Sequence, residues 1–143
     1  MTRRAGDPFS NNHFHVEIAG TSSSDFSEVI LPQGRAEIVE YREGGESVGH
    51  KIAGTIHVSN LVLRRGVTPS NELFQWWRNI VDGVPDRRDV AVILLDEQRQ
   101  PIKRWLMPGI WPASFVVSHL IAVGEAVTLV ESVECAVERF TVE

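Results

Sequence analysis

Only one stretch of this 143-residue chain has a helical period, and most of the remainder alternates at the two-residue period of β-strands. Leu73, Trp76, Trp77, Ile80 and Val81 fall at i, i+3, i+4, i+7 and i+8, which places them on one apolar stripe of a helix. We expect Leu73, Trp76, Trp77 and Ile80 to anchor this helix on a sheet. A single helix among many strands restricts the chain to mainly β architectures.

The predicted helix has both a start signal and a stop signal. Thr68 is a favourable N-cap residue, Pro69 suits the first helical position, and Glu72 places a negative charge in the first turn. Gly83 follows the apolar stripe and is typical of a helix end. The sequence therefore predicts a helix between residues 68 and 83.

Strands are predicted on both sides of this helix. Residues 14–18 alternate between apolar and polar side chains, as in a half-buried strand. Residues 35–43 differ because neither face is cleanly polar, which is typical of a strand with neighbours on both faces. A bend or an edge strand is expected at Trp111 and Pro112. The other expected strands cover residues 26–31, 55–65, 90–95, 102–106 and 126–140.

The predicted fold class is mainly β with one helix (α+β), arranged as an antiparallel β-sandwich or small barrel against which the helix packs. A length of 143 residues with 43% hydrophobic residues suits a single domain, residues 1–143. Two segments lack a core pattern. Residues 1–11 are expected to form a flexible arm, and residues 44–54, which contain four glycines, a flexible exposed loop.

Composition excludes several classes of function. The net charge of -5 argues against a nucleic-acid-binding surface, since phosphate contacts need an excess of Lys and Arg. No apolar run approaches the roughly 20 residues of a membrane span, and no apolar signal segment follows Arg3 and Arg4, so we expect synthesis and folding in the cytoplasm. Cys135 is the only cysteine, which excludes an internal disulfide and a cysteine-based zinc site.

No catalytic constellation stands out in the sequence. Residues 44–52 come close to a P-loop, but Lys51 is displaced by one place and no Ser or Thr follows it. His13 and His15 share one side of a strand beside Glu17, yet no fourth metal ligand is evident, and a solvated or interface face is favoured. The acidic residues lie singly along strands. The sequence therefore predicts no enzyme activity, no cofactor and no metal.

Seven segments follow one another in a distinctive order, among them Glu-Tyr-Arg-Glu-Gly-Gly and Leu-Phe-Gln-Trp-Trp: residues 14–18, 26–29, 40–45, 60–68, 73–77, 92–97 and 105–112. In this order the chain resembles, from residue 12 to about 137, the tail-tube proteins of contractile phage tails and of extracellular injection particles related to antifeeding prophages and Photorhabdus virulence cassettes. It departs from them at residues 20–24, which are richer in serine, and at residues 50–54, where a Lys-Leu-Pro-Gly-like step is more usual.

The resemblance implies a tail-tube fold, similar to the tube of type VI secretion, and a structural role. Such subunits form hexameric rings that stack into a hollow tube, and contraction of a surrounding sheath drives the tube through a target envelope. The implied partners are further copies of the chain, the sheath protein, the baseplate and spike, the tube initiator, and cargo in the lumen. The implied location is a phage tail or a phage tail-like particle, including particles released extracellularly.

The resemblance also implies particular surfaces. Residues 40–54 would act as an assembly element, the arm 1–11 would reach the next ring, and the helix would face the sheath. The candidate lumen-facing residues are Glu37, Glu134 and Glu138, because an aqueous channel needs polar walls. The candidate assembly residues are Tyr41, Arg42, Glu43, Gly44, Gly45, Gly49 and Lys51.

Two other functions stay open at this point. One is a tube-initiator ring at the baseplate end, which would share the fold. The other is a monomeric β-barrel that binds a ligand or a metal through His13 and His15. A metal-dependent shift in melting temperature would favour the monomeric binder, whereas concentration-dependent assembly would favour a tube subunit.

Overall fold

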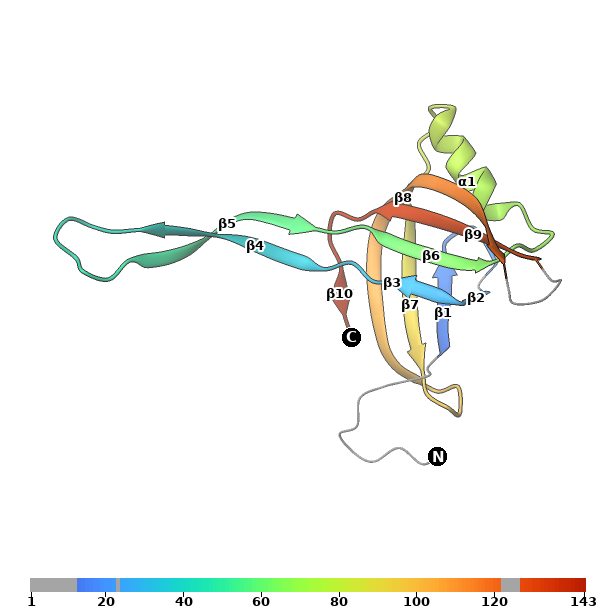
Figure 1. The fold of residues 1–143 in the computed structure, drawn as a ribbon, viewed down its shortest axis with the longest axis horizontal. Coiled ribbons are helices and arrows are strands. Elements are labelled where there is room, and N and C mark those ends of the chain that lie inside the picture. Colours follow the sequence, from blue (N-terminus) through green and yellow to red (C-terminus); the bar gives the residue numbers. More distant parts are fainter. Residues whose placement is uncertain (1–12, 23, 122–126) are drawn as a thin grey trace.

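The computed structural model describes residues 13–22, 24–121 and 127–143, and these contain one helix among many strands (Figure 1). This content confirms the predicted fold class, and the predicted arm 1–11 lies outside the described residues. The helix, α1 (Glu72–Val81), lies between β6 and β7 in the sequence. The strands are β1 (His13–Ile18), β2 (Ser24–Phe26), β3 (Glu28–Ile30), β4 (Gly34–Tyr41), β5 (His50–Val58), β6 (Leu61–Gly66), β7 (Arg88–Leu95), β8 (Pro101–Ile121), β9 (Val127–Ala136) and β10 (Thr141–Val142).

The main sheet has the strand order β2-β1-β7-β8-β9-β6-β3, with every pair antiparallel and β10 added to β8. Two segments change their pairing partners along the chain, and they fold this sheet into a small barrel with two layers. β8 pairs with β7 as far as Ile110 and with β9 from Trp111 onward. β2 pairs with β1, whereas β3, separated from β2 only by Ser27, pairs with β6.

The barrel therefore has two layers. We call β2, β1, β7 and the first half of β8 the first layer, and β3, β6, β9 and residues 111–121 of β8 the second layer. A register shift between Pro112 and Ser114 lies just after the point where β8 passes between layers, which confirms the predicted bend.

The core lies between the two layers, and α1 packs against β8 (Figure 1). Alternate residues point inward, so that Leu61 and Leu63 of β6 and Val133 and Cys135 of β9 are all fully buried. Burial, helped by the nearby charge of Glu134, raises the pKa of the Cys135 thiol to about 12, so this thiol is inert at neutral pH. The rest of the core is Val16, Ile18, Phe26, Leu73, Trp76, Val90, Val92, Met107, Ile110 and Val137.

A buried ion pair crosses the core, and it was not predicted from the sequence. Arg65 of β6 donates from Nε to Glu131 Oε1 of β9 at 2.6 Å, and from Nη1 to Ser24 Oγ of β2 at 2.9 Å. The guanidinium also lies 5.1 Å from the ring centroid of Phe26. Because the alternation points both charged side chains inward, they connect β2 to β6 and β9 at the place where the barrel closes.

The helix begins later than predicted. Thr68 is not the N-cap, because α1 starts at Glu72 with Asn71 as its N-cap residue. The Thr68 hydroxyl instead accepts a hydrogen bond from the Ser70 backbone N–H at 3.3 Å, and the Ser70 hydroxyl accepts one from the Glu72 N–H at 3.2 Å. These local side-chain to backbone bonds stabilise a turn in place of a first helical turn.

The predicted helix end is correct. Gly83 has φ of 77°, in the left-handed region that suits glycine. Its backbone N–H donates to the Ile80 carbonyl at 3.1 Å, and the next N–H, of Val84, donates to the Asn79 carbonyl at 2.9 Å. These two bonds form a Schellman motif, which satisfies carbonyls that the helix end would leave free.

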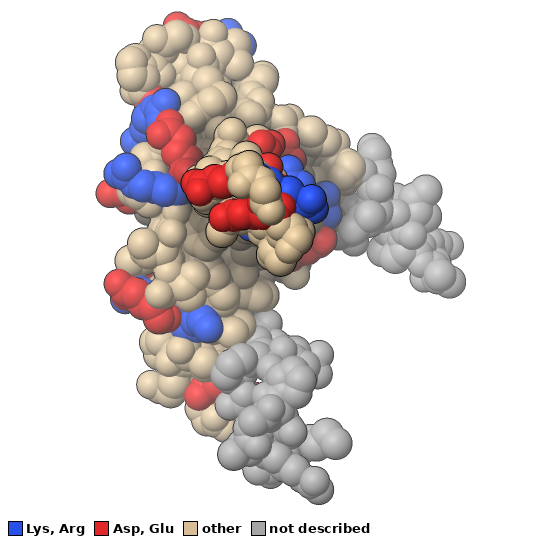
Figure 2. Space-filling view, turned by 90° about the vertical axis from the view of Figure 1, so that its left-hand side faces the viewer, with Lys and Arg blue, Asp and Glu red and all other residues tan. Residues whose placement is uncertain are grey.

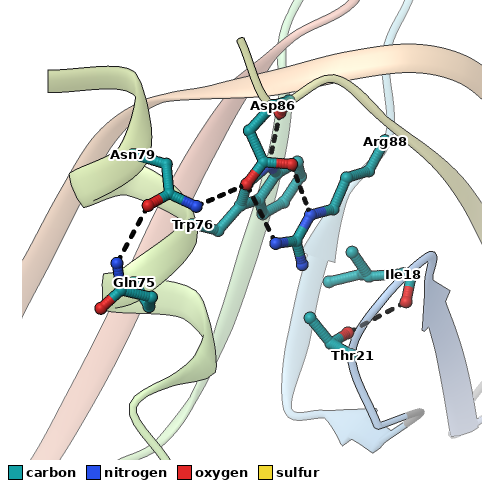
Figure 3. A network of polar contacts seen from close by, with 7 residues as sticks. All are labelled: Ile18, Thr21, Gln75, Trp76, Asn79, Asp86 and Arg88. Carbon is teal, nitrogen blue, oxygen red and sulfur yellow. Dashed lines mark hydrogen bonds and ion pairs between the residues drawn. The ribbon is translucent and has the colours of Figure 1, made fainter. Parts of the chain in front are cut away.

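Trp76 fixes the helix to the barrel (Figure 3). Its Nε1 donates to the Asp86 main-chain carbonyl at 2.8 Å, and the Asp86 carboxylate accepts from Arg88 at 2.9 and 3.0 Å and from Asn79 at 2.9 Å. Hydrogen bonds from Arg88, and then from Asn79, hold the pKa of Asp86 below its ordinary value. Of the other expected anchors, Leu73 is buried, whereas Trp77 and Ile80 are half-buried.

Candidate assembly surfaces

The strands β4 and β5 form a hairpin that projects from the barrel as a separate two-stranded sheet (Figure 1). This corrects two predictions. The flexible loop 44–54 is shorter than expected, because residues 50–54 belong to β5, and the expected strand 55–65 is split between β5 and β6. Gly54 lies within β5, beside a β-bulge opposite Glu37. A side chain does not fit there, because a Cβ at this position would lie 2.9 Å from Val39 Cγ2.

One face of the hairpin is an apolar strip. Ala36 and Ile38 of β4 lie on the same face as Ala53 and Ile56 of β5, and Ile38 and Ile56 are 72% and 63% exposed. An isolated two-stranded hairpin is at best marginally stable in water, and exposed contiguous apolar side chains mark interaction sites. The strip therefore has the character of a contact surface rather than of a solvated face.

The opposite face of the hairpin combines apolar residues with histidine–carboxylate pairs. Val39 lies opposite Ile52 at its centre. Towards the barrel, His57 Nε2 and Glu37 Oε1 are 2.9 Å apart, and towards the tip the His50 ring stacks on Tyr41 with centroids 5.3 Å apart. Strand 35–43 was predicted to have neighbours on both faces. Among the described residues, both faces of β4 are exposed, and both carry apolar side chains.

The predicted assembly residues gather at the distal end of this hairpin. Tyr41 ends β4, Lys51 lies in β5 opposite Glu40, and the others occupy the turn between the strands. Gly45 has φ of 83°, and the Glu46 N–H donates to the Glu43 carbonyl at 3.0 Å to close that turn. Figure 2, which looks onto the hairpin tip, shows acidic and basic side chains gathered together around it.

The predicted lumen residues do not share one surface. Glu37 lies on the hairpin and pairs with His57. Glu138 lies beyond the end of β9 at Ala136, so the expected strand 126–140 was too long. Its carboxylate accepts from Arg87 Nη1 at 2.6 Å, and this hydrogen bond lowers its pKa. Glu134 alone lies within a strand of the second layer.

The outward surface of the second layer, which we call the hydroxyl face, combines serine and charged side chains with valines. On β8 and β9 it carries Ser114 and Glu134 side by side, and on β3 and β6 it carries an ion pair in which Arg64 Nη1 donates to Glu28 Oε2 at 3.0 Å. The face is hollowed, with a cavity volume of about 420 Å³. Its lining residues are Ser27, Glu28, Val62, Arg64, Ser114, Val116, Ser118, Val130, Ser132 and Glu134.

The second layer ends in two free strand edges. Within residues 13–22, 24–121 and 127–143, β3 pairs only with β6, and residues 111–121 of β8 pair only with β9. Because neighbouring strands alternate in direction across the layer, β3 and the second half of β8 run in opposite directions. The β8 edge agrees with the edge strand that Trp111 and Pro112 predicted.

The residues considered for metal binding have another arrangement. His15 Nδ1 lies 3.0 Å from Asp25 Oδ1, and Arg99 Nη2 donates to Asp25 Oδ2 at 3.0 Å. Hydrogen bonds from His15 and then Arg99 lower the pKa of Asp25. In the part of the chain that the structure describes, no group of His, Cys, Asp and Glu side chains could hold a metal; the His13 side chain lies outside that part. The described helix is too short to span a membrane.

Known proteins share both the sequence pattern and this fold. A family model for the T4-like virus tail tube protein gp19 matches residues 10–141. The chain belongs to this tail-tube family. A search of curated proteins gives no match. The match covers the barrel, the helix and the projecting hairpin, so this tail-tube protein has a structural rather than an enzymatic role.

Several solved structures have a similar fold. A chain of the sheath–tube complex of an extracellular contractile injection system, PVC, is 21% identical with a TM-score of 0.78, covering 97% of this chain and 93% of that one. A chain of the anti-feeding prophage baseplate is 20% identical with a TM-score of 0.76, covering 100% and 97%. Hcp1 from Flavobacterium johnsoniae is 13% identical with a TM-score of 0.56, covering 91% and 94%. These likenesses confirm the predicted tail-tube fold.

Proposed function

We propose that this tail-tube protein forms the inner tube of a contractile tail or injection system, as hexameric rings stacked into a hollow conduit. One observation carries the proposal: the second layer has two free edges of opposite direction and one face that carries serine and charged side chains. Unpaired strand edges are a hazard in a monomer, and head-to-tail pairing between identical subunits removes them. The relative from the anti-feeding prophage belongs to a baseplate described as sixfold symmetrised, which supports six copies in a ring.

The strand directions support a ring. If β3 of one subunit lies beside residues 111–121 of the next, the two strands are antiparallel, so the alternation within each layer continues across the contact. Repetition of the same contact generates one continuous barrel around a central channel.

The hydroxyl face then lines the channel. Serine side chains and the Glu28–Arg64 pair stay hydrated at the wall of an aqueous conduit, and Glu134 adds a negative charge to it. Among the residues predicted to face the lumen, we retain Glu134 only. Glu37 lies on the hairpin and Glu138 is engaged by Arg87 outside the strand, so neither belongs to this face.

The hairpin serves as the element that joins one ring to the next. Among the described residues, no part of the same chain packs against its apolar strip. Because the hairpin projects from the barrel, it can reach another subunit (Figure 1). The sheath protein would surround the tube, the baseplate, spike and initiator would start it, and cargo would occupy the lumen. Sheath contraction would drive the tube through the target envelope.

Disulfide trapping tests the ring contact. Ile30→Cys places a thiol on the hydroxyl face at the β3 edge, and it is combined in turn with Ser114→Cys, Val116→Cys and Ser118→Cys at the β8 edge. Sampling positions two residues apart covers different registers of the contact. Oxidation should give a covalent ladder that ends at the hexamer for at least one pair.

Ile30→Cys with Val130→Cys is the matched control, because Val130 lies on the same face but in the interior strand β9. The native Cys135 does not interfere because it is buried. If no edge pair cross-links in assembled material, or if the control cross-links equally well, the proposed contact is wrong.

A separate variant tests the hairpin. Tyr41→Ala combined with Arg42→Ala removes two exposed side chains near the tip without touching the barrel core. The double variant should stay folded and soluble but should no longer form tubes, as seen by electron microscopy. Normal tube formation by this variant would remove the assembly role of the tip.

A further inference from the structure

One flank of α1 is apolar without facing the core of its own subunit. Phe74, Trp77 and Val81 follow one another at i, i+3 and i+7, beside the buried stripe that contains Trp76. Phe74 and Val81 are 41% and 52% exposed, and Trp77 is half-buried. We call these three residues the apolar flank.

The other flank of the helix has a different character. Gln75 Nε2 donates to Asn79 Oδ1 at 3.0 Å, and Asn79 Nδ2 donates to the Asp86 carboxylate at 2.9 Å. Gln75 is exposed, as a solvated helix surface requires. The helix is therefore asymmetric, since only one flank leaves apolar side chains in water.

The apolar flank lies over the free edge of the second layer. The Phe74 ring meets the Phe115 ring of β8 edge-on, with centroids 5.6 Å apart, and Phe74 and Trp77 have centroids 6.0 Å apart. Phe115 and Val117 share the inward side of this edge strand, because their partners on β9 are both buried. Val117 is nevertheless 48% exposed. Unpaired backbone groups and uncovered apolar side chains thus occur at the same place.

We propose that the apolar flank, with Phe115 and Val117, forms a roof that covers the β3 strand of the neighbouring subunit as it pairs with the β8 edge. This inference rests on the proposed ring. A second copy of the chain is the fitting occupant because its β3 supplies both missing components. Its free backbone edge continues the ladder, and Val29, with the following Leu31, offers half-buried apolar side chains next to that edge.

The two flanks of α1 then lie in different surroundings. The Phe74 side faces the neighbouring subunit within the ring, and the Gln75 side remains at the outside of the tube. A helix that only faced the sheath would need no apolar residues beside the strand edge. The backbone pairing alone would fix two strands, whereas the roof would also exclude water from the new hydrogen bonds.

Thiol accessibility tests the proposal in assembled tubes. Val81→Cys places a thiol on the apolar flank with little change in size, and Gln75→Cys, on the exposed polar flank, is the matched control. In unassembled subunits both thiols should react with a maleimide. In tubes without sheath, Val81→Cys should react at least about tenfold more slowly, since access then requires local opening, while Gln75→Cys should keep its rate.

A second variant checks the energetic role of the same flank. Phe74→Ser should lower the melting temperature of the subunit by only a few degrees, because Phe74 is already 41% exposed, but it should raise the concentration needed for assembly. If wild-type tubes form and Val81→Cys reacts as fast in them as in subunits, the roof is wrong while the tube function stands. A wild-type chain that never assembles, even with particle lysate as seed, overturns both.

Discussion

The two adjacent tryptophans of α1 should differ strongly in their contribution to stability. Trp76 is 0% exposed, its Nε1 donates to the Asp86 carbonyl at 2.8 Å, and the Arg88 guanidinium lies 5.2 Å from its ring centroid. Trp77 is half-buried and lies beside Phe74 at the margin of the helix. Trp76→Ala is therefore expected to destabilise the subunit much more than Trp77→Ala.

The magnitude follows from burial and from the hydrogen bond. Removing a fully buried tryptophan side chain costs about 3 to 5 kcal/mol, because the lost transfer free energy adds to that of the cavity. Loss of the bond to the Asp86 carbonyl adds about 1 kcal/mol. Trp77→Ala removes a side chain that already contacts water, so we expect about 1 to 2 kcal/mol. At about 3 °C per kcal/mol for a chain of this size, the two melting temperatures should differ by about 10 °C.

The assay is urea unfolding of unassembled subunits, followed by far-ultraviolet circular dichroism, which reports mainly on the backbone rather than on tryptophan. The wild type and both variants are compared at one low protein concentration, with the denaturant slope checked for equality. Equal losses for the two variants, or a larger loss for Trp77→Ala, would refute the assignment of Trp76 as the anchor.

Three further outcomes follow from the buried and paired groups. Because hydrogen bonds from Arg88 hold the pKa of Asp86 below 3.8, their contribution is present above that pH and is lost as pH falls through the folded-state pKa. Asp86→Asn should therefore lower stability at neutral pH and flatten its fall below about pH 4, measured by melting temperature against pH. Glu131→Gln leaves its arginine partner charged and poorly paired in the core, so urea unfolding should show a loss of about 3 kcal/mol or more. The Cys135 thiol should react with a disulfide reagent only as fast as the subunit unfolds, and rapid labelling of the native state would contradict its burial.

The sequence correctly predicted the elements that bury only one of their faces. The alternation of residues 14–18 and the stripe through Leu73 and Trp76 identify a strand and a helix, because each has one buried side. Gly83 marked the helix end correctly because it must adopt a left-handed conformation. The N-terminus of the helix was misplaced because Thr68 and Ser70 form local turn bonds that compete with a cap.

Features that depend on distant pairing were not predictable from the pattern. The glycines of residues 44–54 indicated a loop, whereas pairing with β4 makes the last five of these positions part of a strand. The pairing of Arg65 with Glu131 was not predicted, since only the register between β6 and β9 brings the two side chains together inside the barrel. The three glutamates assigned to a lumen had the same charge but lie in different surroundings, which the sequence does not distinguish.

The assembly surfaces were predictable only in part. The unusual strand 35–43 indicated a segment with neighbours on both faces. Among the described residues its apolar side chains are exposed, so the neighbours stay a prediction. Phe74 gave no signal because it lies off the main stripe of the helix. Its position over a free strand edge becomes evident only when β8, β9 and α1 are placed together.

A cryo-electron microscopy reconstruction of the assembled protein tests the central claim most directly. We expect rings of uniform width in which β3 of one subunit pairs antiparallel with residues 111–121 of the next, and the hydroxyl face with Glu134 lines the channel. Rings closed through other strands, or a hydroxyl face turned outward, would contradict the proposed subunit contact. A chain that remains monomeric and is absent from every tubular particle in its own lysate would contradict the tube function itself.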